Sequence, residues 1–133
     1  MISEKVKVQL REYQRSEITE YHIYRRLASM QKSPKNRLVL EQIAEDEKRH
    51  YEEWKEYTGE DIKPDWGKVR KYFWISSIFG ITFGTKLMER EESNAQEEYN
   101  SLPPEIEKAE TIASEEQKHE SALLAMLDEE RMR

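Results

Sequence analysis

The chain contains the stretch IAEDEKRHYEEW at residues 43–54 and the related stretch IASEEQKHESAL at residues 112–123. Both carry the pattern Ile-Ala-x-x-Glu-x-x-His, and the second copy lies 69 positions after the first (119 − 50). Residues three apart share one face of an α-helix, so each copy points a carboxylate and an imidazole the same way. That face also carries apolar residues, where charged groups are seldom found without a partner.

The composition favours a single all-α domain covering residues 1–133. Charged residues make up 38% of the chain and hydrophobic residues 36%, with four Gly and four Pro. This profile is typical of long helices, and the length is sufficient to bury one core. The net charge of −6 argues against nucleic-acid binding. The absence of cysteine excludes disulfides, thiolate metal sites and thiol nucleophiles.

Hydrophobic periodicity predicts four helices that pack as an antiparallel four-helix bundle. The helices are expected at residues 3–31, 34–57, 68–100 and 104–131. Ser33 and Pro34 form an N-cap and first-turn pair for the second helix, and Gly59 is its stop signal. A longer connection follows, in which Asp65 is a candidate cap for the third helix.

The first and third predicted helices also carry acidic residues on apolar faces. These residues are Glu17 and Glu20 in the first helix and Glu89 and Glu92 in the third. A tyrosine follows seven residues after Glu17 and after Glu92, at Tyr24 and Tyr99. Each tyrosine either hydrogen-bonds a ligand carboxylate or simply packs in the core.

Inward-facing carboxylates on all four helices repel one another in a medium of low dielectric constant. They are tolerated if they take up protons, pair with Lys or Arg, or surround bound cations. The predicted inward faces contain no Lys or Arg, which favours two divalent metal ions. Oxygen and imidazole donors without thiolate suit iron or manganese better than structural zinc. The expected ligands are Glu17, Glu47, His50, Glu92, Glu116 and His119.

Together these motifs resemble the ferritin-like superfamily, and most closely its rubrerythrin branch. The chain departs from rubrerythrins because, without cysteine, it has no rubredoxin-type electron-transfer domain. The segments FGITFG at residues 79–84 and LDEER at residues 127–131 are also similar to the N-terminal ferritin-like domain of vacuolar iron transporter-type proteins. That resemblance implies a membrane domain, either attached beyond Arg133 or associated with the chain.

The resemblance implies a role for each ligand and no catalytic residues beyond them. Glu47 and Glu116 would bridge two Fe ions, or Mn ions. Glu17 and Glu92 would be terminal ligands, and Glu20 and Glu89 would be additional or switching ones. Fe(II) would react with O2 or peroxide, and an external electron donor would be required.

Three functions remain open at this point. The first is a di-iron ferroxidase or peroxidase-type oxidoreductase in iron handling or oxidative-stress defence. The second is a non-catalytic Fe(II)- or Mn(II)-binding module that senses metal or delivers it to a membrane transporter. The third is a metal-free interaction bundle whose carboxylates are held by Lys or Arg.

The sequence also predicts partners and location. The charged residues after Met1 predict no signal peptide, and the most apolar run, residues 72–85, is shorter than the ~20 residues that a membrane helix needs. We therefore expect a cytoplasmic domain, membrane-tethered if the chain continues. Tyr72, Phe79 and Phe83 form a second apolar face on the third helix, which favours a homodimer, with contact to a membrane domain or a lipid surface as the alternative.

Other polar residues are expected to lie in solvent. His22 points away from Glu17 and is expected at the surface or an interface. The acidic residues expected on solvated faces are Glu45, Asp46, Glu52, Glu53, Glu115 and Glu129.

Overall fold

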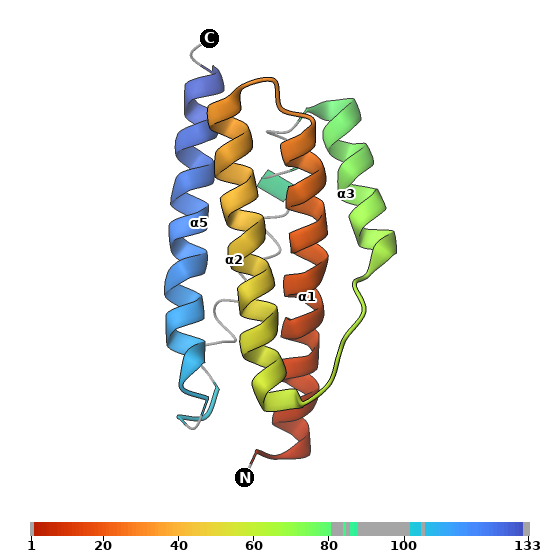
Figure 1. Cartoon of the computed structure of the whole chain (residues 1–133), viewed down its shortest axis with the longest axis vertical. Helices are drawn as coiled ribbons and strands as arrows, with labels where there is room; N and C mark the ends of the chain where they lie inside the picture. The colour runs from red at the N-terminus through yellow and green to blue at the C-terminus, as the bar shows by residue number, and fades with distance from the viewer. Residues whose placement is uncertain (1, 81–83, 85, 88–101, 105, 132–133) are drawn as a thin grey trace.

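The computed structural model describes residues 2–80, 84, 86–87, 102–104 and 106–131, with the backbone alone for residues 127–131. Four helices are defined in this part of the chain, which contains no strand. They are α1 (Glu4–Ser29), α2 (Pro34–Thr58), α3 (Trp66–Phe79) and α5 (Lys108–Arg131) (Figure 1). The predicted all-α four-helix bundle is confirmed.

The first two helices begin and end where the sequence predicts. Ser3 and Ser33 each accept a hydrogen bond from the backbone N–H three residues later, at 3.2 and 3.3 Å. Pro34 occupies the first position of α2, where its missing N–H costs nothing. At the other end, Gly59 adopts a left-handed φ of 68° and donates its N–H to the Lys55 carbonyl at 2.7 Å. The two helices are therefore delimited by local chemistry.

The connection between α2 and α3 is tied to the bundle by side chains. Tyr51 accepts a hydrogen bond from the Ile62 N–H at 2.9 Å, and Thr19 accepts one from the Asp65 N–H at 2.9 Å. Asp65 then caps α3 by accepting from the Lys68 N–H at 3.1 Å. In Figure 1, α3 lies beside α1 and runs in the same direction, whereas α2 runs opposite to α1 and α5.

The prediction of one continuous helix over residues 68–100 is wrong at Gly80. Helix α3 begins at Trp66 and ends at Phe79, because Gly80 adopts a φ of 96° and a ψ of 156°, which is not helical. Glycine reaches this conformation at little cost, since it has no Cβ. Helical backbone recurs at residues 84, 86 and 87.

The fourth predicted helix also needs correction at its start. Helix α5 begins at Lys108 and not at residue 104, because Pro103 and Pro104 belong to a turn that precedes it. The Pro103 carbonyl accepts a hydrogen bond from the Ile106 N–H at 3.0 Å. Proline is common in the turn before a helix, so the pair marks the approach to α5.

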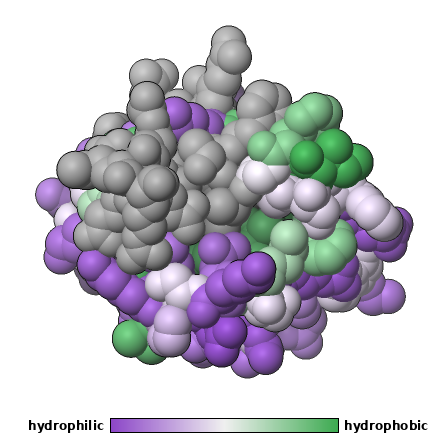
Figure 2. Space-filling view, turned by 90° about the horizontal axis from the view of Figure 1, so that it is seen from above, coloured by the Kyte–Doolittle hydropathy of each residue, from purple (hydrophilic) through white to green (hydrophobic). Residues whose placement is uncertain are grey.

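Helix α3 exposes a row of apolar side chains. These are Trp74, Ile78 and Phe79, with exposed fractions of 60%, 68% and 66%. Figure 2 shows hydrophobic residues gathered on the side of the molecule where α3 lies. The prediction that Tyr72 belongs to this outer face is wrong, because Tyr72 is fully buried and packs in the core. Phe83 lies outside the described residues, and a second copy covering this face stays a prediction.

The described part of the chain buries two apolar clusters. The first comprises Tyr21, Ile23, Tyr24, Leu27, Ala28, Leu40, Ile43, Ala44, Val69, Tyr72, Leu123 and Met126. The second comprises Leu10, Tyr13, Trp54, Ile106, Ala109 and Ile112. On α1, α2 and α5 the residues between these clusters include the predicted Glu and His ligands. The candidate site is therefore a polar layer between two apolar layers.

Within the described residues, the helices are too short or too polar to cross a membrane.

Candidate metal centre

Three helices place predicted ligands in one buried layer. Helix α1 contributes Glu17, α2 contributes Glu47 and His50, and α5 contributes Glu116 and His119. These five residues are 0–7% exposed. One donor atom from each of Glu17, Glu47, His50 and Glu116 lies within 4.8 Å of the other three. The structure thus brings together side chains as far as 99 positions apart (116 − 17).

The His50 ring is oriented with Nδ1 toward the inner carboxylates. Its Nδ1 lies 3.0 Å from Glu116 Oε1, 3.4 Å from Glu17 Oε2 and 3.7 Å from Glu47 Oε1. Its Nε2 lies on the other side, 3.1 Å from Glu115 Oε2. The nitrogen available to a metal ion is therefore Nδ1.

The His119 ring has the same orientation from the opposite helix. Its Nδ1 lies 3.0 Å from Glu47 Oε1 and 3.9 Å from Glu116 Oε2. Its Nε2 lies 2.8 Å from Asp46 Oδ2. The two imidazole rings are 6.0 Å apart between centroids and inclined by only 29°. They flank the carboxylates of Glu47 and Glu116 as a matched pair.

Asp46 and Glu115 form crossed pairs with the two histidines. Asp46 on α2 holds His119 of α5, and Glu115 on α5 holds His50 of α2. The prediction that both acids are solvated is wrong, since their side chains are only 22% and 20% exposed. The same prediction is wrong for Glu53, whose side chain is 19% exposed. The repeat contained the signal that would have found them. An acidic residue directly precedes the motif glutamate in both copies, at the same 69-residue offset (115 − 46).

Neighbouring residues extend the site. Glu20 is 8% exposed, and its negative charge contributes to the raised pKa of Glu47. Tyr24 is 1% exposed and belongs to the first apolar cluster. Trp54, which the sequence analysis did not assign to the site, is fully buried and is among the groups that lower the pKa of Glu17, after His50 and Glu47. Its position seven residues after Glu47, two helical turns on the same face, was the available signal.

Burial and neighbouring charge act together on Glu47. Desolvation raises the pKa of this carboxyl well above its ordinary value, and the negative charges of Glu116, Glu17 and Glu20 raise it further. Neither Glu47 oxygen receives a hydrogen bond from the described part of the chain. Glu47 is thus the carboxylate least accommodated by the protein alone.

His50 counteracts part of this repulsion. Burial alone would lower its pKa, but hydrogen bonds to Glu116 and Glu17 raise the pKa of His50 to about 11. For Glu17, burial alone would raise the pKa, but His50 and the other donors lower it. Within the described residues, Glu47 and Glu116 form their ion pairs with His50 and His119.

The residues present suit a divalent cation. They offer three carboxylates and an imidazole nitrogen, donors that iron and manganese accept. Ligand atoms on opposite sides of a small divalent ion are about 4.2 Å apart, close to the 4.8 Å span of this cluster. The orphaned oxygens of Glu47 supply the strongest reason to place a cation here. The cluster can therefore hold metal.

Three of the predicted site residues cannot be placed. Glu89, Glu92 and Tyr99 lie outside the described residues. Metal binding by each of the predicted ligands stays a prediction, and so does the number of metal ions.

Fold and site together define a class of protein. It is an all-α helical bundle with a buried carboxylate and imidazole cluster, an arrangement consistent with a ferritin-like fold. Comparison with protein-family models, curated proteins and solved structures found no match to this chain. The functional argument therefore rests on the site itself.

Proposed function

We propose that this protein binds Fe(II) in the Glu17, Glu47, His50 and Glu116 cluster and promotes its oxidation by O2 or peroxide. The observation that carries the proposal is the proximity of these four ligand atoms, within 4.8 Å of one another, in side chains that are 0–6% exposed. Carboxylates gathered this closely without solvent need positive charge between them.

The positions of Glu47 and Glu116 support a site for two ions. The two oxygens of Glu116 point to different histidines, with Oε1 3.0 Å from His50 and Oε2 3.9 Å from His119. Glu47 Oε1 also lies between both imidazoles, at 3.7 and 3.0 Å. Carboxylates placed between two nitrogen donors suit a bridging role.

The surrounding residues hold the donors in a fixed orientation. Glu115 and Asp46 occupy the outer nitrogen of each imidazole, so the inner nitrogen stays directed at the carboxylates. The ligand layer lies between two apolar clusters, and its ligand side chains are 0–7% exposed. The protein thus supplies preorganised ligands in an environment of low dielectric constant.

In this proposal Fe(II) is the substrate. Two Fe(II) ions give up one electron each, and O2 takes up both electrons with two protons to give hydrogen peroxide. If peroxide is the oxidant, the same two electrons and two protons convert it to two molecules of water. The negative charge of the carboxylates favours Fe(III) over Fe(II), because it stabilises the higher charge.

The test is anaerobic Fe(II) titration followed by rapid mixing with O2 or peroxide. The variants are the double substitution Glu47→Gln with Glu116→Gln and, as a matched control on the same helix, the exposed Glu45→Gln. We expect oxygen-dependent Fe(III) absorbance in the wild type and the control and its loss in the double variant. Circular dichroism checks that each variant is folded.

The outcomes separate the candidate functions. Reversible Fe(II) or Mn(II) binding without oxidation would replace the oxidase with the metal-sensing or delivery module. A wild-type protein that binds no divalent metal would refute both.

A further inference from the structure

Arg49 lies outside the ligand layer, on α2, and its guanidinium reaches across to α5. It donates to Glu115 Oε1 at 3.2 Å and also to Glu115 Oε2. It donates to Asp46 Oδ1 at 3.2 Å and to Glu53 Oε1 at 3.4 Å. One planar group therefore joins acidic residues of two helices.

Two of the acids that Arg49 contacts are those that hold the histidines. Asp46 uses Oδ1 for Arg49 and Oδ2 for His119 Nε2. Glu115 uses Oε2 for both Arg49 and His50 Nε2. Arg49 is therefore linked to each imidazole through one carboxylate. The residues that it contacts, Asp46, Glu53 and Glu115, are not predicted metal ligands.

We propose that Arg49 is a positioning residue that holds Asp46 and Glu115 on the outer nitrogens of both histidines and so directs both Nδ1 atoms into the site. This inference rests on the proposed metal-binding function. The guanidinium suits the task because its N–H groups form a rigid planar fork that can serve two carboxylates at once. The ammonium of lysine is a point charge and lacks this geometry.

The alternative is that Arg49 forms only a surface ion pair. Its side chain is 47% exposed, and exposed ion pairs contribute little to stability. The two interpretations predict opposite effects on metal binding. If Arg49 acted only by charge, its removal would strengthen cation binding, because one positive charge near the site would be lost. If it positions the histidines, its removal weakens binding.

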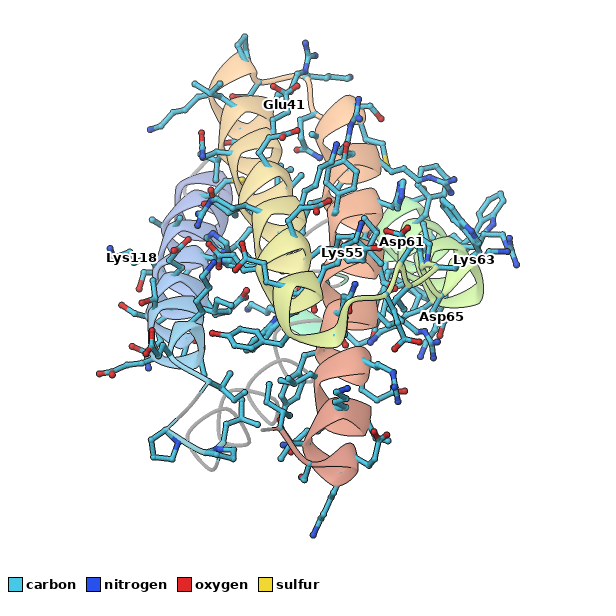
Figure 3. The ribbon with its side chains drawn as sticks, turned by 60° about the horizontal axis from the view of Figure 1, so that its bottom comes forward. Glu41, Lys55, Asp61, Lys63, Asp65 and Lys118 are labelled. Atoms are coloured by element: carbon cyan, nitrogen blue, oxygen red, sulfur yellow. The ribbon has the colours of Figure 1, made fainter. Side chains whose placement is uncertain are left out.

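Lys118 is the matched control for charge. It occupies the position equivalent to Arg49 in the second motif copy (118 − 49 = 69). It lines a surface pocket together with Asp46, Glu115 and His119. Figure 3 shows its side chain pointing away from the bundle. Lys118→Gln therefore removes the same charge from the same region without touching the Arg49 contacts.

The experiment measures Co(II) affinity by optical titration for the wild type, Arg49→Gln, Arg49→Lys and Lys118→Gln. We expect about tenfold weaker binding in Arg49→Gln, the lower end of the effect of losing an outer partner of a ligand. Lys118→Gln is expected to bind as tightly as the wild type or more tightly. Arg49→Lys is expected to weaken binding as well, because an ammonium lacks the planar fork that serves two carboxylates, and full retention there would show that the fork is not required and would overturn the proposal.

A second readout follows the imidazoles directly. In Zn(II)-loaded protein labelled with ¹⁵N-histidine, we expect Nδ1 to be metal-bound and Nε2 to carry the proton in His50 and His119. In Arg49→Gln we expect faster solvent exchange of both Nε2 protons, with the distant His22 unchanged as an internal reference. Unchanged affinity and unchanged exchange in Arg49→Gln would overturn the proposal. A wild type that binds neither Co(II) nor Zn(II) would instead show that the proposed function fails.

Discussion

At the scale of single residues, the buried carboxylates that suit metal binding also destabilise the metal-free folded state. Glu47 is fully buried, and both burial and the charges of Glu116, Glu17 and Glu20 raise its pKa. A group whose pKa is higher in the folded state than in the unfolded state favours folding when protonated. Its contribution is present below the unfolded value of 4.5 and is lost as the pH rises.

We therefore predict that Glu47→Gln stabilises the metal-free protein while it weakens metal binding. The gain should be on the order of 1 kcal/mol and larger at pH 8 than at pH 5, because the unfolded wild-type chain gives up the Glu47 proton as the pH rises, whereas glutamine has no proton to lose. Urea denaturation with a chelator present measures this difference. Exposed Glu45→Gln serves as control, and equal stability of wild type and Glu47→Gln at pH 8 would contradict the prediction.

His22 provides a pH test away from the ligand layer. Its ring lies against the Trp66 ring, with centroids 4.6 Å apart. Burial lowers the pKa of His22, and the positive charges of Arg26, Arg25 and Lys48 lower it further. The folded state thus prefers the neutral ring.

We predict that the wild type loses stability relative to His22→Gln as the pH falls from 7.5 to 5.5. The sign follows because the unfolded chain takes up the proton first, at its ordinary value of 6.5. Urea midpoints of both proteins at the two pH values measure the effect. A difference between the proteins that stays constant with pH would refute it.

Sequence reasoning found the ligands more readily than the residues that orient them. Glu47 and His50 stand out because they repeat at fixed spacing on an apolar face. Asp46 and Glu115 lie among many other acids, and their role arises only when α2 and α5 cross at a particular register. Spacing along one helix cannot reveal a partner on another helix.

At the scale of elements, local sequence signals predicted both ends of α2 but not the end of α3. Ser33, Pro34 and Gly59 delimit α2 because caps and left-handed glycines act within a few residues. The end of α3 was not predicted because apolar residues continue across Gly80. The helical spacing of the sequence therefore persists at a residue whose backbone is not helical. The face of Tyr72 was predicted wrongly for a related reason. Its position around the helix was counted relative to residues beyond Gly80, as if one helix continued through that residue.

Two glycines allow a matched test of helix boundaries. Gly59 ends α2 with a φ of 68°, where an L side chain is strained. Gly67 lies in the first turn of α3, and a Cβ there would meet only Asp65 Oδ1 at 3.4 Å. We predict that Gly59→Ala destabilises the protein by about 1 kcal/mol and that Gly67→Ala stabilises it by about 0.5 kcal/mol.

Thermal unfolding of both variants checks these signs. The contrast between them matters more than either value, because both replace glycine by alanine in the same protein. Destabilisation of equal size at both positions would show that backbone conformation does not distinguish these sites.

At the scale of the whole molecule, a polar layer between two apolar clusters makes stability depend on what the layer contains. A ligand that binds only the folded state stabilises it by about 2.7 kcal/mol at a free concentration 100 times its Kd. We predict that Mn(II) raises the melting temperature and that a chelator reverses the increase. The double variant Glu47→Gln with Glu116→Gln should show no such response. A wild type that melts at the same temperature with Mn(II) and with chelator would contradict the prediction.

The crossed pairs between α2 and α5 have a consequence for a divided chain. Cutting within residues 59–65 would leave His50 on one fragment and its outer partner Glu115 on the other, and likewise would separate His119 from Asp46. Neither piece would keep a fully supported imidazole. Each fragment thus supplies the carboxylate that supports the imidazole of the other fragment. Recovery of metal affinity on mixing the two fragments would therefore report their reassembly without any added label.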